Sequence, residues 1–110
     1  MTQQTLISGV ELTLGRSTYI VPPLNIAGHK RFRPFFQQAM RGEMDPNDLA
    51  NFDAVAEIVH CALVRNYPEL TLEQVEFDLD PVNIGRAFEV VLGAAGFEPV
   101  PPGEARPGTP

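Results

Sequence analysis

Cysteine, tryptophan and long apolar runs are scarce or missing in this sequence of 110 residues. Its one cysteine cannot form a disulfide within the chain. No apolar run reaches the roughly 20 residues that span a bilayer, and no stretch has the parts of a signal peptide. We therefore expect a soluble cytosolic protein whose stability depends on a packed core rather than on cross-links.

Motifs that carry common chemistry are missing as well. The sequence has no glycine-rich phosphate loop, no Cys-x-x-Cys pair, no nucleophile elbow and no spaced set of histidine and carboxylate ligands. Asp78 and Asp80 are the nearest approach to a cation site, but two acids between consecutive helices are typical of capping and solvation. We expect no enzymatic activity, no cofactor and no bound metal.

The pair His60–Cys61 is the one place where a nucleophile could be suspected. Both residues fall in a predicted helix, where successive side chains diverge by about 100° and do not face each other. A histidine that activates the thiol would have to come from elsewhere, and His29 is the only other one. We interpret His60 as bordering the core and Cys61 as a small, weakly polar packing residue.

Charge is distributed unevenly along the chain. The net charge of −6 argues against a general nucleic-acid binder, because phosphate binding depends mainly on Lys and Arg. Residues 1–42 carry five basic residues and one acid, a net charge of +4, whereas residues 43–110 carry three arginines and thirteen acids, a net charge of −10. This asymmetry indicates either ion pairing within the molecule or head-to-tail contact between copies.

Local patterns predict a mainly helical α+β fold: an N-terminal β-hairpin followed by about four helices in a small bundle. Residues 10–14 alternate between apolar and polar, residues 15–17 supply a turn, and residues 18–21 favour a second strand. Four helical segments are predicted after the hairpin. The first is capped by Asn25 and is kinked or split at Pro34, and the second runs from Asp45–Pro46 to Asn66. The third starts at the capping box Thr71–Gln74, and the fourth runs from Asp80–Pro81 to Gly96.

These segments predict a single domain over residues 8–97, between a flexible N-terminus at residues 1–7 and a disordered Pro/Gly-rich tail at residues 98–110. After the second helix, Asn66 is expected to adopt the left-handed backbone of a helix end, with the ring of Tyr67 packed beside it. Apolar spacings of three and four predict a shared core that contains Phe52, Val59, Leu63, Phe88 and Val91.

The segment from His29 to Phe36 interleaves basic and aromatic residues. Such a pattern can serve RNA binding, but at helical spacing Phe32, Phe36 and Met40 share one face and are better explained as core. Phe35 is then left without an obvious partner, and an exposed aromatic beside cations is a plausible protein-binding anchor. The candidate protein-interaction residues are Lys30, Arg31, Arg33, Phe35 and Phe36, with acidic acceptors for a second copy around Asp45, Asp48 and Asp53 or around Glu73 and Glu76.

Four stretches in this order resemble the tail assembly chaperones of long-tailed bacteriophages and prophages. They are residues 19–25, the segment from Lys30 to Phe36, the helix end and turn at residues 58–71, and the closing helix at residues 88–96. The resemblance covers roughly residues 8–97 and depends on the order of these stretches, since none of them is diagnostic alone.

The resemblance implies a non-catalytic protein in the cytoplasm of the host bacterium that is absent from the mature virion. It would bind and solubilise the tape measure protein, help to recruit tail tube subunits, which many relatives do through a longer frameshifted form, and self-associate, with no nucleic-acid or membrane partner. Two alternatives stay open: a small structural virion protein such as a head–tail connector or minor tail component, and a regulatory binding module unrelated to phage.

Overall fold

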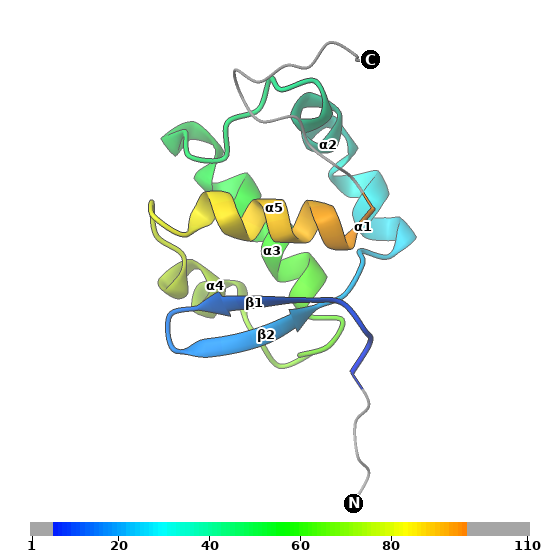
Figure 1. The fold of residues 1–110 in the computed structure, drawn as a ribbon, viewed down its shortest axis with the longest axis vertical. Coiled ribbons are helices and arrows are strands. Elements are labelled where there is room, and N and C mark those ends of the chain that lie inside the picture. Colours follow the sequence, from blue (N-terminus) through cyan, green and yellow to red (C-terminus); the bar gives the residue numbers. More distant parts are fainter. Residues whose placement is uncertain (1–5, 97–110) are drawn as a thin grey trace, which may run out of the picture.

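The computed structural model describes residues 6–96 as a two-stranded hairpin followed by five α-helices and one short 3₁₀ helix (Figure 1). Strands β1 (Val10–Leu14) and β2 (Ser17–Val21) pair antiparallel and leave Gly15 and Arg16 as a two-residue turn. Gly15 has a φ of 59°, which such turns require and which glycine adopts at little cost. The predicted α+β class with an N-terminal hairpin is confirmed.

Helices α1 (Ile26–Arg31) and α2 (Arg33–Met40) arise from one predicted helix that is split. The side-chain oxygen of Asn25 accepts the Gly28 N–H at 2.9 Å, which confirms the predicted cap. Pro34 lies in the first turn of α2, where a backbone N–H has no partner within the helix. The proline thus begins a new helix instead of interrupting one.

The next helix begins later than predicted. After Met40 the chain forms turns and the 3₁₀ helix η1 (Leu49–Asn51), and α3 spans Phe52–Leu63. The Asp45 carboxylate accepts the amide of residue 47 at 2.9 Å, and that of Asp48 accepts the amide of residue 50 at 3.0 Å. Each carboxylate therefore closes its own local turn, and Asp45 does not cap a continuous helix.

Helix α4 (Leu72–Asp78) begins at the predicted capping box. The Thr71 hydroxyl accepts the Gln74 N–H at 3.1 Å, and the Gln74 side chain accepts the Thr71 N–H at 2.9 Å. Leu70 packs against the core just before the cap, and Val75 is buried, as expected for a hydrophobic staple.

Helix α5 (Ile84–Ala94) begins three residues after the predicted Asp80–Pro81 start. The Asp80 carboxylate accepts the amides of Val82 and Asn83, both at 2.8 Å, and so closes the turn that leads into the helix. At the other end Gly96 has a φ of 94°, consistent with the predicted stop.

Asn66 differs from its prediction. Its backbone is not left-handed, because no residue other than glycine has a positive φ within residues 6–96. Its side chain is instead buried, 4% exposed, and bonds to the backbone of Ile7 and Ile20. Ile7 is therefore held to the domain, although it falls in the N-terminus predicted to be flexible, whereas residues 1–5 and the predicted tail at residues 98–110 lie outside the described residues.

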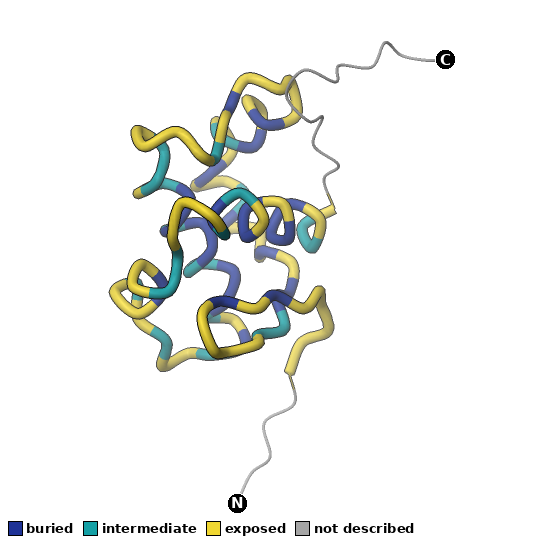
Figure 2. The backbone as a smooth tube through the Cα atoms, turned by 60° about the vertical axis from the view of Figure 1, so that its left-hand side comes forward, coloured by how far each residue is buried: buried dark blue, intermediate teal, exposed yellow. Residues whose placement is uncertain are grey.

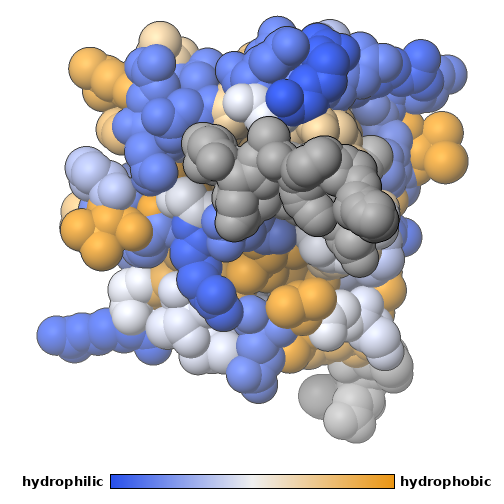
Figure 3. All heavy atoms as spheres, turned by 45° about the horizontal axis from the view of Figure 1, so that its top comes forward, coloured by the Kyte–Doolittle hydropathy of each residue, from blue (hydrophilic) through white to orange (hydrophobic). Residues whose placement is uncertain are grey.

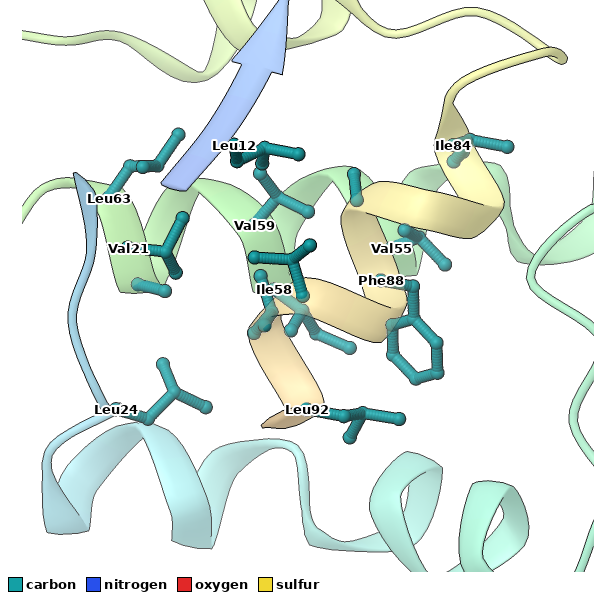
Figure 4. Packing of buried hydrophobic residues seen from close by; sticks show 14 of the residues in the cluster. Leu12, Val21, Leu24, Val55, Ile58, Val59, Leu63, Ile84, Phe88 and Leu92 are labelled. Atoms are coloured by element: carbon teal, nitrogen blue, oxygen red, sulfur yellow. The ribbon is translucent and has the colours of Figure 1, made fainter. Parts of the chain in front are cut away.

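The core lies where α3 and α5 pack against each other and against the inner face of the hairpin. Figure 4 shows side chains from β1, β2, α3 and α5 pointing into this shared space, and Figure 2 shows buried positions toward the middle of the fold with exposed outer turns. Of the five predicted core residues, Val59, Leu63, Phe88 and Val91 are buried, and Phe52 is half-buried against the cluster. Burial of such side chains stabilises the fold by about 1.5–3 kcal/mol each.

Candidate protein-binding surfaces

His60 and Cys61 face different surroundings. His60 Nε2 lies 2.9 Å from the carbonyl oxygen of Leu70. The Cys61 thiol packs against α1, so closely that a Cβ added to Gly28 would lie 3.2 Å from its sulfur. Burial raises the pKa of the Cys61 thiol, and the Arg31 guanidinium opposes this only in part. A reactive thiolate needs a lowered pKa, so the environment favours packing over nucleophilic chemistry.

Clusters of metal-ligand type do not occur within residues 6–96, where no three His, Cys, Asp or Glu side chains gather closely enough to hold an ion. The candidate cation-binding pair, Asp78 at the end of α4 and Asp80 just before α5, takes part in local structure. The Asp80 carboxylate accepts two backbone amides, and the backbone oxygen of Asp78 accepts the side-chain amide of Asn83 at 3.0 Å. The two residues therefore act in the turn between α4 and α5.

The predicted basic residues Lys30, Arg31 and Arg33 are all exposed. Arg31 is the one already engaged, because its guanidinium lies 3.1 Å from the Glu57 carboxylate and 4.8 Å from the centroid of the Phe32 ring. The charge asymmetry along the sequence is thus partly resolved within the molecule, through a pair between α1 and α3. Lys30 and Arg33 form no ion pair within the described part of the chain and remain the better candidates for an intermolecular contact.

The predicted aromatic anchors are less accessible than the site hypothesis requires. Phe36 is only 2% exposed, with its ring centroid 5.9 Å from that of His29, and Phe35 is half-buried against the core. The buried side of α2 continues through Ala39, while Met40 is 37% exposed. The burial of Phe36 therefore confirms the core position predicted from helical spacing and removes it from the candidate protein-interaction residues, whereas Met40, predicted in the core, lies at the surface.

A basic groove of about 610 Å³ runs along α1 and α2. Arg33 and Arg41 give it positive charge, although Arg41 also pairs with Glu43 at 3.0 Å. Met40 contributes an apolar wall. The lining residues are His29, Arg33, Phe36, Gln37, Met40 and Arg41. This groove, called here the basic groove, contains Arg33 but not Lys30 or Phe35.

An acidic groove of about 620 Å³ lies between β2 and α4. Its lining residues are Ser17, Tyr19, Leu70, Glu73, Gln74, Phe77 and Asp78. Phe77 is 89% exposed at its edge, beside two carboxylates. Helix α4 carries three acids and no basic residue, so this surface, called here the acidic groove, complements the basic groove in charge.

Phe77 was not among the candidate interaction residues predicted from the sequence, although helical spacing already indicates that it faces outward. Val75 faces the core, and two helical steps of about 100° turn Phe77 to the opposite side of α4. Three other large apolar residues are strongly exposed: Ile26 is 74%, Leu49 77% and Val82 91% exposed. The face drawn in Figure 3 likewise shows apolar residues in separate groups among hydrophilic ones. Phe77 differs from the others in lining a groove with acidic neighbours.

Comparison of the chain with protein-family models, with curated proteins and with solved structures found no match in any of the three. Among the described residues, no helix is long and apolar enough to cross a membrane.

Proposed function

We propose that the chain is a non-catalytic tail assembly chaperone of a long-tailed bacteriophage or prophage. In this role it binds the tape measure protein in the host cytoplasm, keeps it soluble, helps to recruit tail tube subunits, and leaves before the virion is complete. The starting point is the sequence resemblance over residues 8–97. The structure adds surfaces suited to binding a protein, and these are what can be tested.

The observation that carries the proposal is the exposed ring of Phe77 on the acidic groove. An aromatic ring gains hydrophobic free energy of about 1.5–3 kcal/mol when a partner covers it. Leu70 and Tyr19 extend the apolar lining, while Glu73 and Asp78 supply negative charge. A groove of this kind fits the apolar stripe of a long helix that carries basic residues at its margin. The helical tape measure protein is the partner we assign to it.

Self-association is the second part of the proposal, and the two grooves give it a direction. Contact between a basic groove and an acidic groove uses two different patches, so it builds an open spiral or a closed ring rather than a dimer. The acceptor is better placed at Glu73 and Asp78 than at Asp45 and Asp48, whose carboxylates each accept a local backbone amide. A second copy and the helical partner therefore compete for the acidic groove of any one copy. Exposed ion pairs contribute about 0–1 kcal/mol each, so they set orientation more than affinity.

The test uses the long helical protein that we expect to be encoded directly downstream of this chain. A tagged fragment of that protein is used to capture the native chain and two variants, Phe77→Ser and Val82→Ser. Both substitutions remove an apolar side chain that is about nine-tenths exposed, but Val82 lies outside the acidic groove. We expect Val82→Ser to bind like the native chain and Phe77→Ser to bind at least about tenfold more weakly. Equal binding by all three would contradict the assignment of this groove.

The structural virion alternative makes a different prediction about location. A head–tail connector or minor tail component stays in the finished particle, whereas a chaperone leaves it. Mass spectrometry of purified particles separates the two, with the major tube protein as an internal standard. Recovery of this chain in fixed ratio to the tube protein would replace the chaperone proposal.

A further inference from the structure

Helix α5 ends next to the two helices that carry the basic groove. Figure 1 shows the last turn of α5 beside α1, and Figure 4 shows the side chain of Leu92 between α5 and the α1–α2 pair. Gly96 then has a φ of 94°, the backbone of a helix stop, which turns the chain away from the helix axis. The end of α5 therefore lies on the side of the fold where α1 and α2 form the basic groove.

The sequence after α5 has the composition of a groove ligand. Residues 97–104 read Phe-Glu-Pro-Val-Pro-Pro-Gly-Glu, with two acids and no basic residue. Their prolines favour the polyproline II conformation, which forms no hydrogen bonds of its own and is a frequent ligand of aromatic-lined grooves. In that conformation the segment spans about 25 Å. The stretch of helix from His29 to Arg41 that lines the groove spans about 18 Å, so the segment is long enough to follow it.

The basic groove complements this segment in charge and in polarity. Arg33 makes the groove positive and forms no ion pair within the described part of the chain. Arg41 adds a second guanidinium, although the Glu43 carboxylate lies 3.0 Å from it. Met40, which is 37% exposed, and the ring of His29 give the groove an apolar and aromatic side. An acidic segment with an aromatic ring and several proline rings matches both properties.

We propose that residues 97–104 dock in the basic groove of the same chain. Phe97 directly follows the glycine stop, at the position from which an apolar residue packs back toward the last turn of a helix, and its ring covers the apolar side of the groove. The two glutamates of the segment bring negative charge to Arg33 and Arg41. Exposed ion pairs contribute little each, so the aromatic and proline rings supply most of the affinity.

Attachment to α5 favours this segment over a second copy as the occupant of the groove. A tethered ligand acts at an effective concentration of roughly 1 mM, which free copies reach only in concentrated solution. The docking itself does not depend on the proposed function. Its consequence does, because in the head-to-tail contact the same groove receives the acidic groove of the next copy. The segment then inhibits self-association, and an assembling copy must displace it.

A nitroxide spin label on the segment tests the docking at a protein concentration below that of assembly. Ala105→Cys carries the label, in a Cys61→Ser background so that no other thiol reacts. The label broadens the amide signals of nearby residues, and we expect several-fold more broadening at Gln37 and Met40 in the groove than at Ser17 in the hairpin. Equal broadening at all three positions would overturn the proposal.

Two variants separate docking from the mere presence of a tether. Phe97→Ser keeps the length of the segment and should weaken docking at least about tenfold, so that most of the excess broadening in the groove is lost. Val82→Ser is the control, because it also removes an apolar side chain but lies outside the basic groove, and it should leave the broadening unchanged. Unchanged broadening in Phe97→Ser would show that its ring does not hold the segment in place.

A mixture of two samples distinguishes the chain's own segment from that of another copy. Spin-labelled chain without isotope label is mixed with isotope-labelled chain without the spin label. We expect no broadening at Gln37 and Met40 in this mixture. Broadening there would overturn docking within one chain.

The effect on self-association is measured separately, by light scattering at low salt. Phe97→Ser should assemble at about tenfold lower protein concentration than the native chain, because its basic groove is open, and Val82→Ser should assemble like the native chain. If the spin label shows docking but Phe97→Ser assembles like the native chain, the docking stands and the head-to-tail use of the basic groove is contradicted.

Discussion

The side chain of Asn66 pairs with both backbone groups of Ile7, although 59 positions separate them in the sequence. Its oxygen accepts the Ile7 N–H at 2.6 Å, and its amide nitrogen donates to the Ile7 carbonyl at 2.9 Å and to that of Ile20 at 3.1 Å. One side chain thus takes the place of a short strand between the N-terminal segment and β2. This contact explains why Asn66 is the one polar side chain that is buried within residues 6–96.

Replacement of Asn66 by alanine should therefore destabilise the domain. The substitution removes three hydrogen bonds to the backbone at a site that is only 4% exposed. Each buried polar group left without a partner costs about 1–3 kcal/mol of unfolding free energy. We expect a loss of about 2–3 kcal/mol in the free energy of unfolding, measured by urea denaturation. Asn51→Ala is the control, because it removes one exposed bond of 3.0 Å to the backbone of Asp45. Equal losses in the two variants would contradict the role assigned to Asn66.

Tyr67 should contribute to stability through two separable interactions. Its hydroxyl accepts the Ile20 N–H, and its ring meets that of Tyr19 edge-on with centroids 5.1 Å apart. Tyr67→Phe keeps the ring and should lose about 1 kcal/mol of unfolding free energy, whereas Tyr67→Ala should lose more. Partner binding by the folded fraction of Tyr67→Ala should stay normal. Normal stability with lost binding would instead make this turn a contact site.

The features predicted correctly from the sequence depend on neighbours in the chain. The hairpin turn, the Asn25 cap, the break at Pro34 and the Thr71–Gln74 box each follow from residues within a few positions of one another. The pairing of Asn66 with Ile7 could not be predicted this way, because its partner is distant in sequence. The predicted start of α3 at Asp45–Pro46 was wrong, because an Asp before a proline closes a local turn as readily as it caps a helix.

The candidate site was less predictable than the fold. The predicted exposure of Lys30, Arg31 and Arg33 was correct. The ion pair between Arg31 and Glu57 could not be predicted, because it depends on how α1 packs against α3. Helical spacing placed Phe36 correctly in the core with Phe32, but its inclusion among the interaction residues was wrong, because a run of adjacent phenylalanines does not tell how far each ring is covered. The acidic groove forms between β2 and α4, so its shape depends on tertiary packing, and helical phase alone indicates only that Phe77 faces outward.

The thiol of Cys61 should titrate at higher pH in the folded chain than in the unfolded one. Burial raises its pKa, so any stability that it contributes is present below the unfolded pKa and is lost as pH rises through the folded value. The measurement is the pH dependence of alkylation by iodoacetamide, with the same chain in urea as the control. A folded-state midpoint at or below that in urea would contradict this account. Cys61→Ser should leave partner binding nearly unchanged.

Self-association through the charged grooves should be sensitive to charge reversal at Arg33, which lines the basic groove, and at Lys30, which follows the lining residue His29 in α1. The variant Lys30→Glu with Arg33→Glu leaves the Arg31–Glu57 pair intact, so it changes the surface without breaking that contact. Arg16→Glu with Arg86→Glu is the control, since both of those residues are exposed and the change in net charge is equal. Light scattering at low salt should show weaker higher-order assembly only for the first variant. Equal assembly by both variants would contradict the head-to-tail contact.

The central claim is most directly tested by the solubility, in bacterial cells, of the long helical protein that we expect to be encoded directly downstream. It is expressed alone, with the native chain, and with Phe77→Ser, and the soluble and pelleted fractions are quantified. We predict that the helical protein aggregates alone and with Phe77→Ser, and becomes soluble with the native chain. If the native chain leaves the soluble fraction of the helical protein unchanged, the chain is not its chaperone.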